Sequence, residues 1–152
     1  MNIRKSACLF LAWGFYSGKI PKAPGTFGSL AALPFCFLLS VLPTYASIAV
    51  IIIFVGIAVW IAGNAEKLLN EKDPGSIVID EIAGMFVVFM GLPFTPGIIA
   101  GGFVLFRVLD ILKPIPIRTI ERRLSGGTAI VMDDVAAGVM VNLLLRLVMV
   151  FT

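Results

Sequence analysis

The sequence contains no histidine and only two cysteines. Without histidine, the chain cannot build a Ser-His-Asp triad, a phosphohistidine or a histidine-ligated zinc site. Cys8 and Cys36 show no CxxC spacing, and neither is followed six positions later by the arginine that a thiolate phosphatase needs, so we expect two inert thiols. The D-x-D motif of aspartyl-phosphate enzymes is also absent. Catalysis is left to carboxylates, lysine, arginine, hydroxyls and the backbone.

Charged residues are scarce as well. They make up 14% of the chain against about 25% in a typical soluble domain, while apolar residues reach 59% and the mean hydropathy is +1.05. Residues 23–65 and 82–106 contain no charged residue at all. Since a helix needs about 20 apolar residues to cross a membrane, the first run is long enough for two crossings. The composition excludes a disordered chain, an ordinary water-soluble enzyme and a nucleic-acid-binding protein, and it predicts an integral membrane protein with lipids as partners.

The apolar pattern predicts an all-α fold, a polytopic membrane helix bundle of about five membrane segments plus an N-terminal interfacial helix, in a single domain over residues 1–152. Prolines at 43 and in 93–97 interrupt the pattern, because proline cannot continue a helix. The predicted segments are 28–43, 46–63, 76–92, 98–112 and 130–151. Apolar residues 7–16 resemble a signal sequence, but no cleavage site follows them, so we expect an uncleaved helix at the membrane surface.

The basic residues predict the orientation of the bundle. Under the positive-inside rule, the short basic flanks face the cytoplasm, while the uncharged loops at 43–45 and 93–97 face the other side. Arg146 lies near that outer end, where its long side chain could reach the interface. This topology has a further consequence for the acids at the cytoplasmic ends of the last three segments. It brings together Asp80, Glu81, Asp110, Asp133 and Asp134.

Five converging carboxylates would repel one another unless something neutralises them. Lysine and arginine side chains could do so, or a hard cation could. An oxygen-only ligand set favours Mg²⁺, which binds through one or two carboxylates together with substrate phosphate. A metal held in this way can polarise a phosphoryl oxygen and lower the pKa of an attacking water.

Each acidic group also has a simpler structural explanation. Asp80 and Glu81 could be a pair in the first turn of a helix, facing the helix dipole. Asp133 and Asp134 could form an N-cap. Asp110 could be held in an internal ion pair by the basic residues three positions to either side of it.

Two functions from different classes remain open on the residues alone. Intramembrane carboxylates also mark ion paths, so a small cation transporter or channel subunit is the alternative to an enzyme. A membrane scaffold with structural ion pairs is a third possibility. The acids gather at one membrane face in the company of lysine and arginine, which favours a catalytic site over an ion path.

Other small and basic residues accompany the acids. The glycine- and hydroxyl-rich runs 24–29 and 125–128 could present backbone N–H groups to a phosphate, or could simply turn the chain at the membrane. Arg118 and its neighbouring arginines could contact a substrate phosphate or face lipid headgroups. Gly84 and Gly138 each follow an acid by one helical turn, and small residues allow helices to approach closely in membranes. Such an approach would bring the acidic ends together.

Four stretches of the chain together resemble the phosphatidylglycerophosphatase A family. They are PGTFGSLAALP (24–34), GSIVIDEIAGM (75–85), FRVLDILKPIPIR (106–118) and SGGTAIVMDDVAAGV (125–139). The resemblance implies a multi-pass protein of the bacterial inner (cytoplasmic) membrane whose active site faces the cytoplasm. It also implies an Mg²⁺-dependent lipid phosphatase that hydrolyses phosphatidylglycerophosphate to phosphatidylglycerol and inorganic phosphate.

The residues themselves and the resemblance together predict roles for named residues. The expected catalytic residues are Asp80, Glu81, Asp110, Lys113, Asp133 and Asp134, and the five carboxylates among them are also the expected Mg²⁺ ligands. The expected substrate-binding residues are Thr26, Ser29, Arg107 and Arg118. One carboxylate would take a proton from the attacking water while the lysine stabilises phosphoryl charge. Direct attack by water and an aspartyl-phosphate intermediate both stay open.

Overall fold

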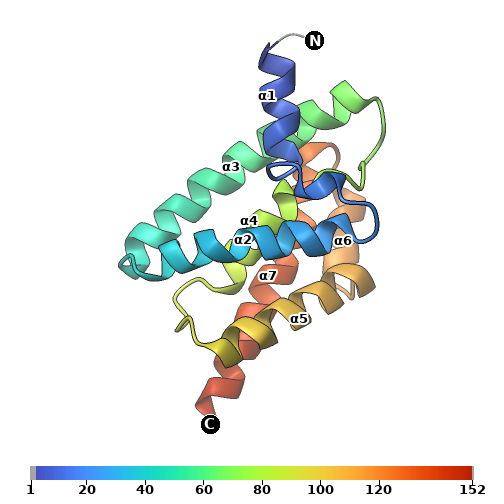
Figure 1. Ribbon diagram of the computed structural model, residues 1–152. Coiled ribbons are helices and arrows are strands. Elements are labelled where there is room, and N and C mark those ends of the chain that lie inside the picture. Colours follow the sequence, from blue (N-terminus) through green and yellow to red (C-terminus); the bar gives the residue numbers. More distant parts are fainter. Residues whose placement is uncertain (1–2, 152) are drawn as a thin grey trace.

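The computed structural model describes residues 3–151, and every regular element in that range is a helix, which confirms the all-α prediction. Figure 1 shows the longer helices running back and forth between two ends of the bundle. The elements are α1 (Ile3–Ala12), the 3-10 helix η1 (Ser17–Lys19), α2 (Pro24–Ser40), α3 (Thr44–Leu69), α4 (Ile79–Val88), α5 (Pro96–Leu112), α6 (Ile117–Arg123) and α7 (Gly127–Val150).

Two of these helices are long and apolar enough to cross a membrane. They are α3 and α7, with mean hydropathies of 2.6 and 1.7 over an 18-residue window. Helix α2 is apolar but has only 17 residues. Helix α3 continues past its predicted end at residue 63 to Leu69. Gly63 packs against Gly127, and Asn64 donates to the carbonyl of Trp60 within the helix, so neither residue ends α3.

Helix α4 is the central element of the bundle, and it is shorter than predicted. The expected membrane segment 76–92 is wrong as one long helix, since α4 has ten residues and is about 15 Å long. All of its residues except Asp80 and Glu81 are buried. It packs against α2, α3, α5 and α7, which explains why its sequence after these two acids is apolar on every side.

Two polar residues of α7 explain how a helix can end inside an apolar bundle. The Asn142 amide donates to the carbonyls of Val87, Val88 and Met90 at 3.3, 2.8 and 3.0 Å. The Arg146 guanidinium donates to the carbonyl of Met90 at 2.9 Å and to the Asn142 side-chain oxygen at 2.8 Å. Carbonyls at a helix end need such partners where water is excluded. Arg146, expected from the sequence only to reach the membrane interface, therefore helps to cap α4.

Glycines bring α4 and α7 into close contact, as predicted. A Cβ atom on Gly138 would lie 2.5 Å from the carbonyl oxygen of Gly84, and a Cβ atom on Gly84 would lie 2.9 Å from the carbonyl oxygen of Asp134. No larger residue fits at either position without moving a backbone. Because Asp80 and Asp134 each lie about one turn before one of these glycines, the contact sets the separation of the acids.

The connections alternate between the two ends of the bundle. Residues 41–43 and 89–95 lie at one end, and residues 70–78 and 113–126 lie at the other (Figure 1). The second end therefore holds the start of α4, the end of α5 and the start of α7, which are the elements that carry the predicted site.

Replacing Asn142 tests the capping of α4. We expect Asn142→Leu to lower the free energy of unfolding by about 1–3 kcal/mol for each carbonyl left without a partner. The control is Asn64→Leu, because the Asn64 amide bonds only within its own helix. Thermal unfolding in detergent measures both, and an equal change in the two variants would contradict the capping role.

Candidate active site

The predicted acids meet around one polar cavity of about 170 Å³ at the second end of the bundle. Its wall is formed by the segment before α4, the first turn of α4, the end of α5 and the start of α7. The charged residues that line it are Asp73, Asp80, Glu81, Asp110, Lys113, Asp133 and Asp134. The predicted convergence of the five carboxylates is thus confirmed, and Lys113 lies with them.

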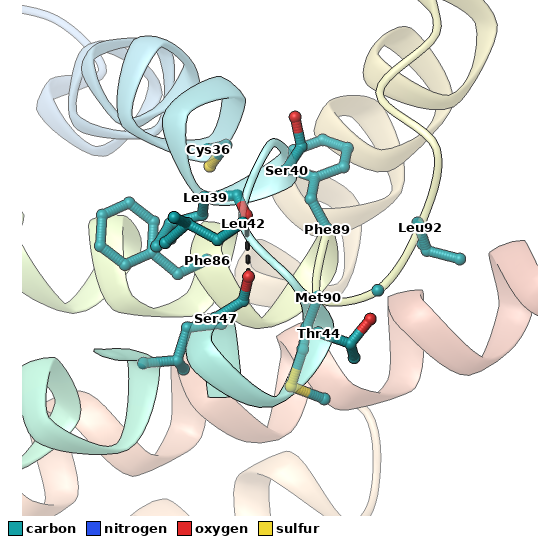
Figure 2. Close-up of a pocket in the computed structure, with 12 residues that line it drawn as sticks. Cys36, Leu39, Ser40, Leu42, Thr44, Ser47, Phe86, Phe89, Met90 and Leu92 are labelled. Atoms are coloured by element: carbon teal, nitrogen blue, oxygen red, sulfur yellow. Dashed lines mark hydrogen bonds between the residues drawn. The ribbon is translucent and has the colours of Figure 1, made fainter. Parts of the chain in front are cut away.

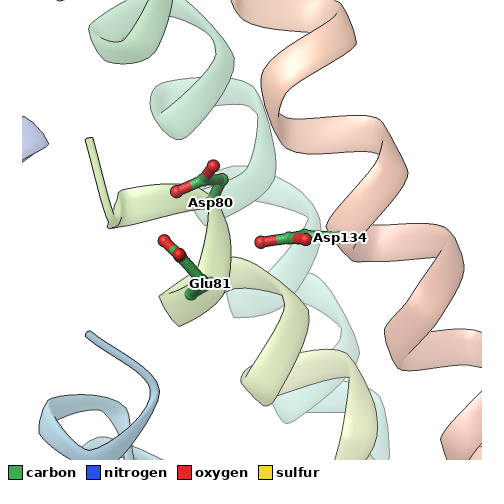
Figure 3. Close-up of side chains that lie close together, drawn as sticks. All are labelled: Asp80, Glu81 and Asp134. Carbon is green, nitrogen blue, oxygen red and sulfur yellow. The ribbon is translucent and has the colours of Figure 1, made fainter. Parts of the chain in front are cut away.

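Three carboxylates form the centre of this site. Asp80 and Glu81 lie in the first turn of α4, and Asp134 faces them from α7 (Figure 3). One oxygen from each side chain lies within 4.8 Å of the other two. Oxygen Oδ1 of Asp80 and oxygen Oε2 of Glu81 are buried and have no hydrogen-bond partner among residues 3–151.

Buried carboxylate oxygens without partners are costly unless a cation compensates them. The three side chains offer only oxygen ligands, the donor type that hard divalent cations prefer. The cluster therefore fits a divalent cation.

The start of α7 decides whether Asp133 and Asp134 form an N-cap. The helix begins at Gly127 with Gly126 as its N-cap, so the N-cap interpretation of Asp133 and Asp134 is wrong. Both acids lie in the second turn and are buried. For Asp80 and Glu81, by contrast, the favourable dipole of a first helical turn and a role in the site coexist.

Arg107 is bound to the acids and does not line the cavity. Its Nη1 donates to Oδ2 of Asp110 at 2.7 Å and lies 3.8 Å from Oε1 of Glu81. The internal ion pair considered for Asp110 therefore exists. A Cβ atom on Gly25 would overlap the Glu81 carboxylate and lie 2.9 Å from the Arg107 guanidinium. The glycine of the first motif thus gives this ion pair the space it needs.

Lys113 pairs with acids of other helices, and not with Asp110 as its spacing suggested. Its ammonium donates to Oδ2 of Asp133 at 2.7 Å and to Oε1 of Glu121 at 3.0 Å. Partial burial opposes the charged form, but these hydrogen bonds outweigh it and raise the pKa of Lys113. A protonated lysine is thereby held at the cavity wall.

Like Arg107, the other three residues predicted to bind substrate lie away from the cavity wall. The Ser29 hydroxyl is fully buried and donates to the carbonyl of Gly25 at 2.8 Å. Thr26 is partly buried in α2, and Arg118 is exposed on α6.

The sequence interpretation missed Asp73 and Glu121. Asp73 lines the cavity, with a left-handed backbone (φ 48°) and its N–H directed to Glu66 Oε1 at 3.3 Å. Its place just before the Pro74-Gly75 turn that leads into the acidic motif is the only sequence signal for it.

A different cavity, of about 230 Å³, lies at the opposite end of the bundle and has another chemistry (Figure 2). None of its lining residues carries a charge. The Ser47 hydroxyl in its wall donates to the carbonyl of Leu39 at 2.8 Å. This cavity offers nothing to neutralise or activate a charged substrate, so the acidic cavity is the candidate active site.

The fold and the site define a helical membrane protein. It has, at one end of its bundle, an acidic cavity whose carboxylates could bind a cation. The family model described as Phosphatidylglycerophosphatase A matches residues 10–149, and the chain belongs to this family.

Curated relatives agree with that family. The chain is 45% identical to phosphatidylglycerophosphatase A of Escherichia coli, over 85% of this chain and 76% of the relative. It is 37% identical to phosphatidylglycerophosphatase A of Haemophilus influenzae, over 85% and 80%. It is also 34% identical to a protein of Bacteroides thetaiotaomicron provisionally named phosphatidylinositol-3-phosphatase, over 86% of both chains. No solved structure matches the chain significantly.

The acidic cluster predicts an unusual response of stability to metal. In chelator-treated protein, Asp80→Asn removes one of three crowded carboxylates, so we expect the melting temperature to rise by about 2–4 °C, as for a gain of about 1 kcal/mol. Added Mg²⁺ should raise the melting temperature of the wild type and not that of the variant.

Glu71→Gln serves as the control, because Glu71 is an exposed acid outside the cavity. Its melting temperature should equal that of the wild type, both in chelator and with added Mg²⁺. An Mg²⁺ shift in Asp80→Asn as large as in the wild type would show that this carboxylate holds no cation.

Proposed function

We propose that this chain is a phosphoric monoester hydrolase that converts phosphatidylglycerophosphate to phosphatidylglycerol and inorganic phosphate. The observation that carries the proposal is the convergence of three carboxylates and a protonated lysine on one cavity. The chain belongs to the phosphatidylglycerophosphatase A family, and two curated relatives bear the name of this activity, which supports the choice of substrate.

Mg²⁺ is the cofactor in this proposal. Asp80, Glu81 and Asp134 would hold it, with Asp110 and Asp133 at the margin of the same cavity. When bound, Mg²⁺ supplies positive charge to the phosphoryl oxygens and makes an attacking water more acidic.

The side chains of the cavity perform the remaining tasks. One cluster carboxylate accepts a proton from the attacking water, whose oxygen forms the new bond to phosphorus. The ester bond to the glycerol oxygen breaks, and that oxygen takes up a proton to become the hydroxyl of phosphatidylglycerol. The Lys113 ammonium stabilises the charge that develops on the phosphoryl oxygens. Arg107 acts as a positioning residue, because it holds Asp110 and Glu81.

The protein in this proposal is a multi-pass protein of the bacterial inner membrane with the active site at the cytoplasmic face. Helices α3 and α7 support membrane insertion. The basic residues near the cavity end of the bundle and the uncharged connections 41–43 and 89–95 at the other end support the orientation. About five segments would lie at membrane depth, with α4 enclosed by the other helices.

The transporter alternative has less support. The acidic cluster lies at one end of the bundle, and the cavity at the other end has no charged residue in its wall. An ion path would need polar groups across the bundle.

Phosphate release from phosphatidylglycerophosphate in detergent tests the function. We expect release that needs Mg²⁺ and stops with EDTA. Asp80→Asn and Asp134→Asn should lower kcat by at least about 10³-fold, and Lys113→Met by about 10²-fold, as for loss of a preorganised charge at the reacting group. Glu71→Gln should keep full activity. Release that is indifferent to EDTA and to these substitutions would refute the proposal.

A further inference from the structure

A larger cavity, of about 440 Å³, adjoins the candidate active site and is the second cavity at this end of the bundle. Asp73, Ile130 and Asp133 line both cavities, so the two spaces share a wall. The second cavity extends between the end of α3, the 70–78 connection, the end of α6 and the start of α7. It lies within the range of volumes typical of small-molecule sites.

Two bases, Lys72 and Arg122, and four acids line the second cavity. Two of the acids, Glu121 and Asp133, are held by Lys113, which leaves Glu66 and Asp73 beside the two bases. Lys72 and Arg122 form no ion pair within residues 3–151. Glu66 and Gly126 line the cavity too, and their side of it is narrow, since a Cβ atom added to Gly126 would lie 3.5 Å from Oε2 of Glu66. The cavity thus offers cations without partners next to carboxylate acceptors.

The proposed substrate has a second charged group besides the phosphate that reacts. A phosphodiester joins its headgroup glycerol to the diacylglycerol, and the glycerol between the two phosphates carries a free hydroxyl. A phosphodiester needs cations, and a hydroxyl donates readily to a carboxylate. The wall of the second cavity supplies both kinds of partner beside the place where the terminal phosphate would react.

We propose that the second cavity is the subsite for the glycerol phosphodiester part of the substrate headgroup. Lys72 and Arg122 pair with the phosphodiester, and Glu66 or Asp73 accepts a hydrogen bond from the glycerol hydroxyl. These residues select substrates in which a phosphodiester lies next to the reacting phosphomonoester. The inference rests on the proposed function and assigns the residues that determine its specificity.

The two products separate this subsite from the reaction site. Phosphatidylglycerol contains the phosphodiester and the glycerol, whereas inorganic phosphate contains only the group that has reacted. Short-chain phosphatidylglycerol, used below its micelle concentration with enzyme in a non-ionic detergent, removes the contribution of a charged membrane surface. Each product is then measured as a competitive inhibitor of hydrolysis of short-chain phosphatidylglycerophosphate.

We expect Arg122→Gln and Lys72→Gln each to raise the Ki of phosphatidylglycerol and the KM of the substrate by about tenfold, as for loss of one charge-assisted contact. The Ki of inorganic phosphate should stay within about twofold, since the reaction site keeps its residues. The matched controls are Arg123→Gln and Lys67→Gln, which remove the same charges from residues outside both cavities. They should leave all three constants unchanged.

Several results would contradict the proposed role of the second cavity. One is an unchanged Ki for phosphatidylglycerol in both variants, and another is an equal rise in the controls. A change confined to inorganic phosphate would make the cavity an exit path for that product instead. Wild-type protein that releases no phosphate from phosphatidylglycerophosphate would refute the proposed function itself, which is a different outcome from all of these.

Discussion

The close contact between α4 and α7 is the constraint on which the site depends. Gly84 and Gly138 let the two backbones approach so closely that a Cβ atom on either glycine would overlap a carbonyl oxygen of the other helix. That distance places Asp80 and Glu81 opposite Asp134 and leaves oxygens of the first two without hydrogen-bond partners among residues 3–151. The packing therefore forces carboxylates together, against their mutual repulsion, and creates a position that a cation can stabilise.

The remaining polar contacts make this arrangement tolerable inside an apolar bundle. Arg107 binds Asp110 and lies near Glu81, and Lys113 binds Asp133 and Glu121. Three of the acids next to the central cluster are therefore paired with a base. At the other end, Asn142 and Arg146 cap the short α4 helix. A short helix is what allows the acidic first turn of α4 to lie inside the bundle while its last turn stays surrounded by apolar side chains.

Much of the site could be predicted from the sequence, because hydropathy and the distribution of basic residues decide which segment ends share a face. These two features correctly predicted that Asp80, Asp110 and Asp134 lie close together. The length of α4 could not be predicted, since its caps come from residues more than 50 positions away. The partners of Lys113 depend on the placement of α6, and the role of Asp73 depends on a connection held by tertiary contacts. The second cavity exists only once α3, α6 and α7 are assembled.

The most direct test of the account compares two glycine substitutions in phosphate release from phosphatidylglycerophosphate with Mg²⁺. A Cβ atom on Gly138 would press on the Gly84 carbonyl, whereas one on Gly56 would meet nothing within 4 Å. If the α4–α7 contact positions the carboxylates, Gly138→Ala loses activity by more than about tenfold, because small misplacements of catalytic groups are costly, while Gly56→Ala keeps it. Equal activity of the two variants would contradict the account.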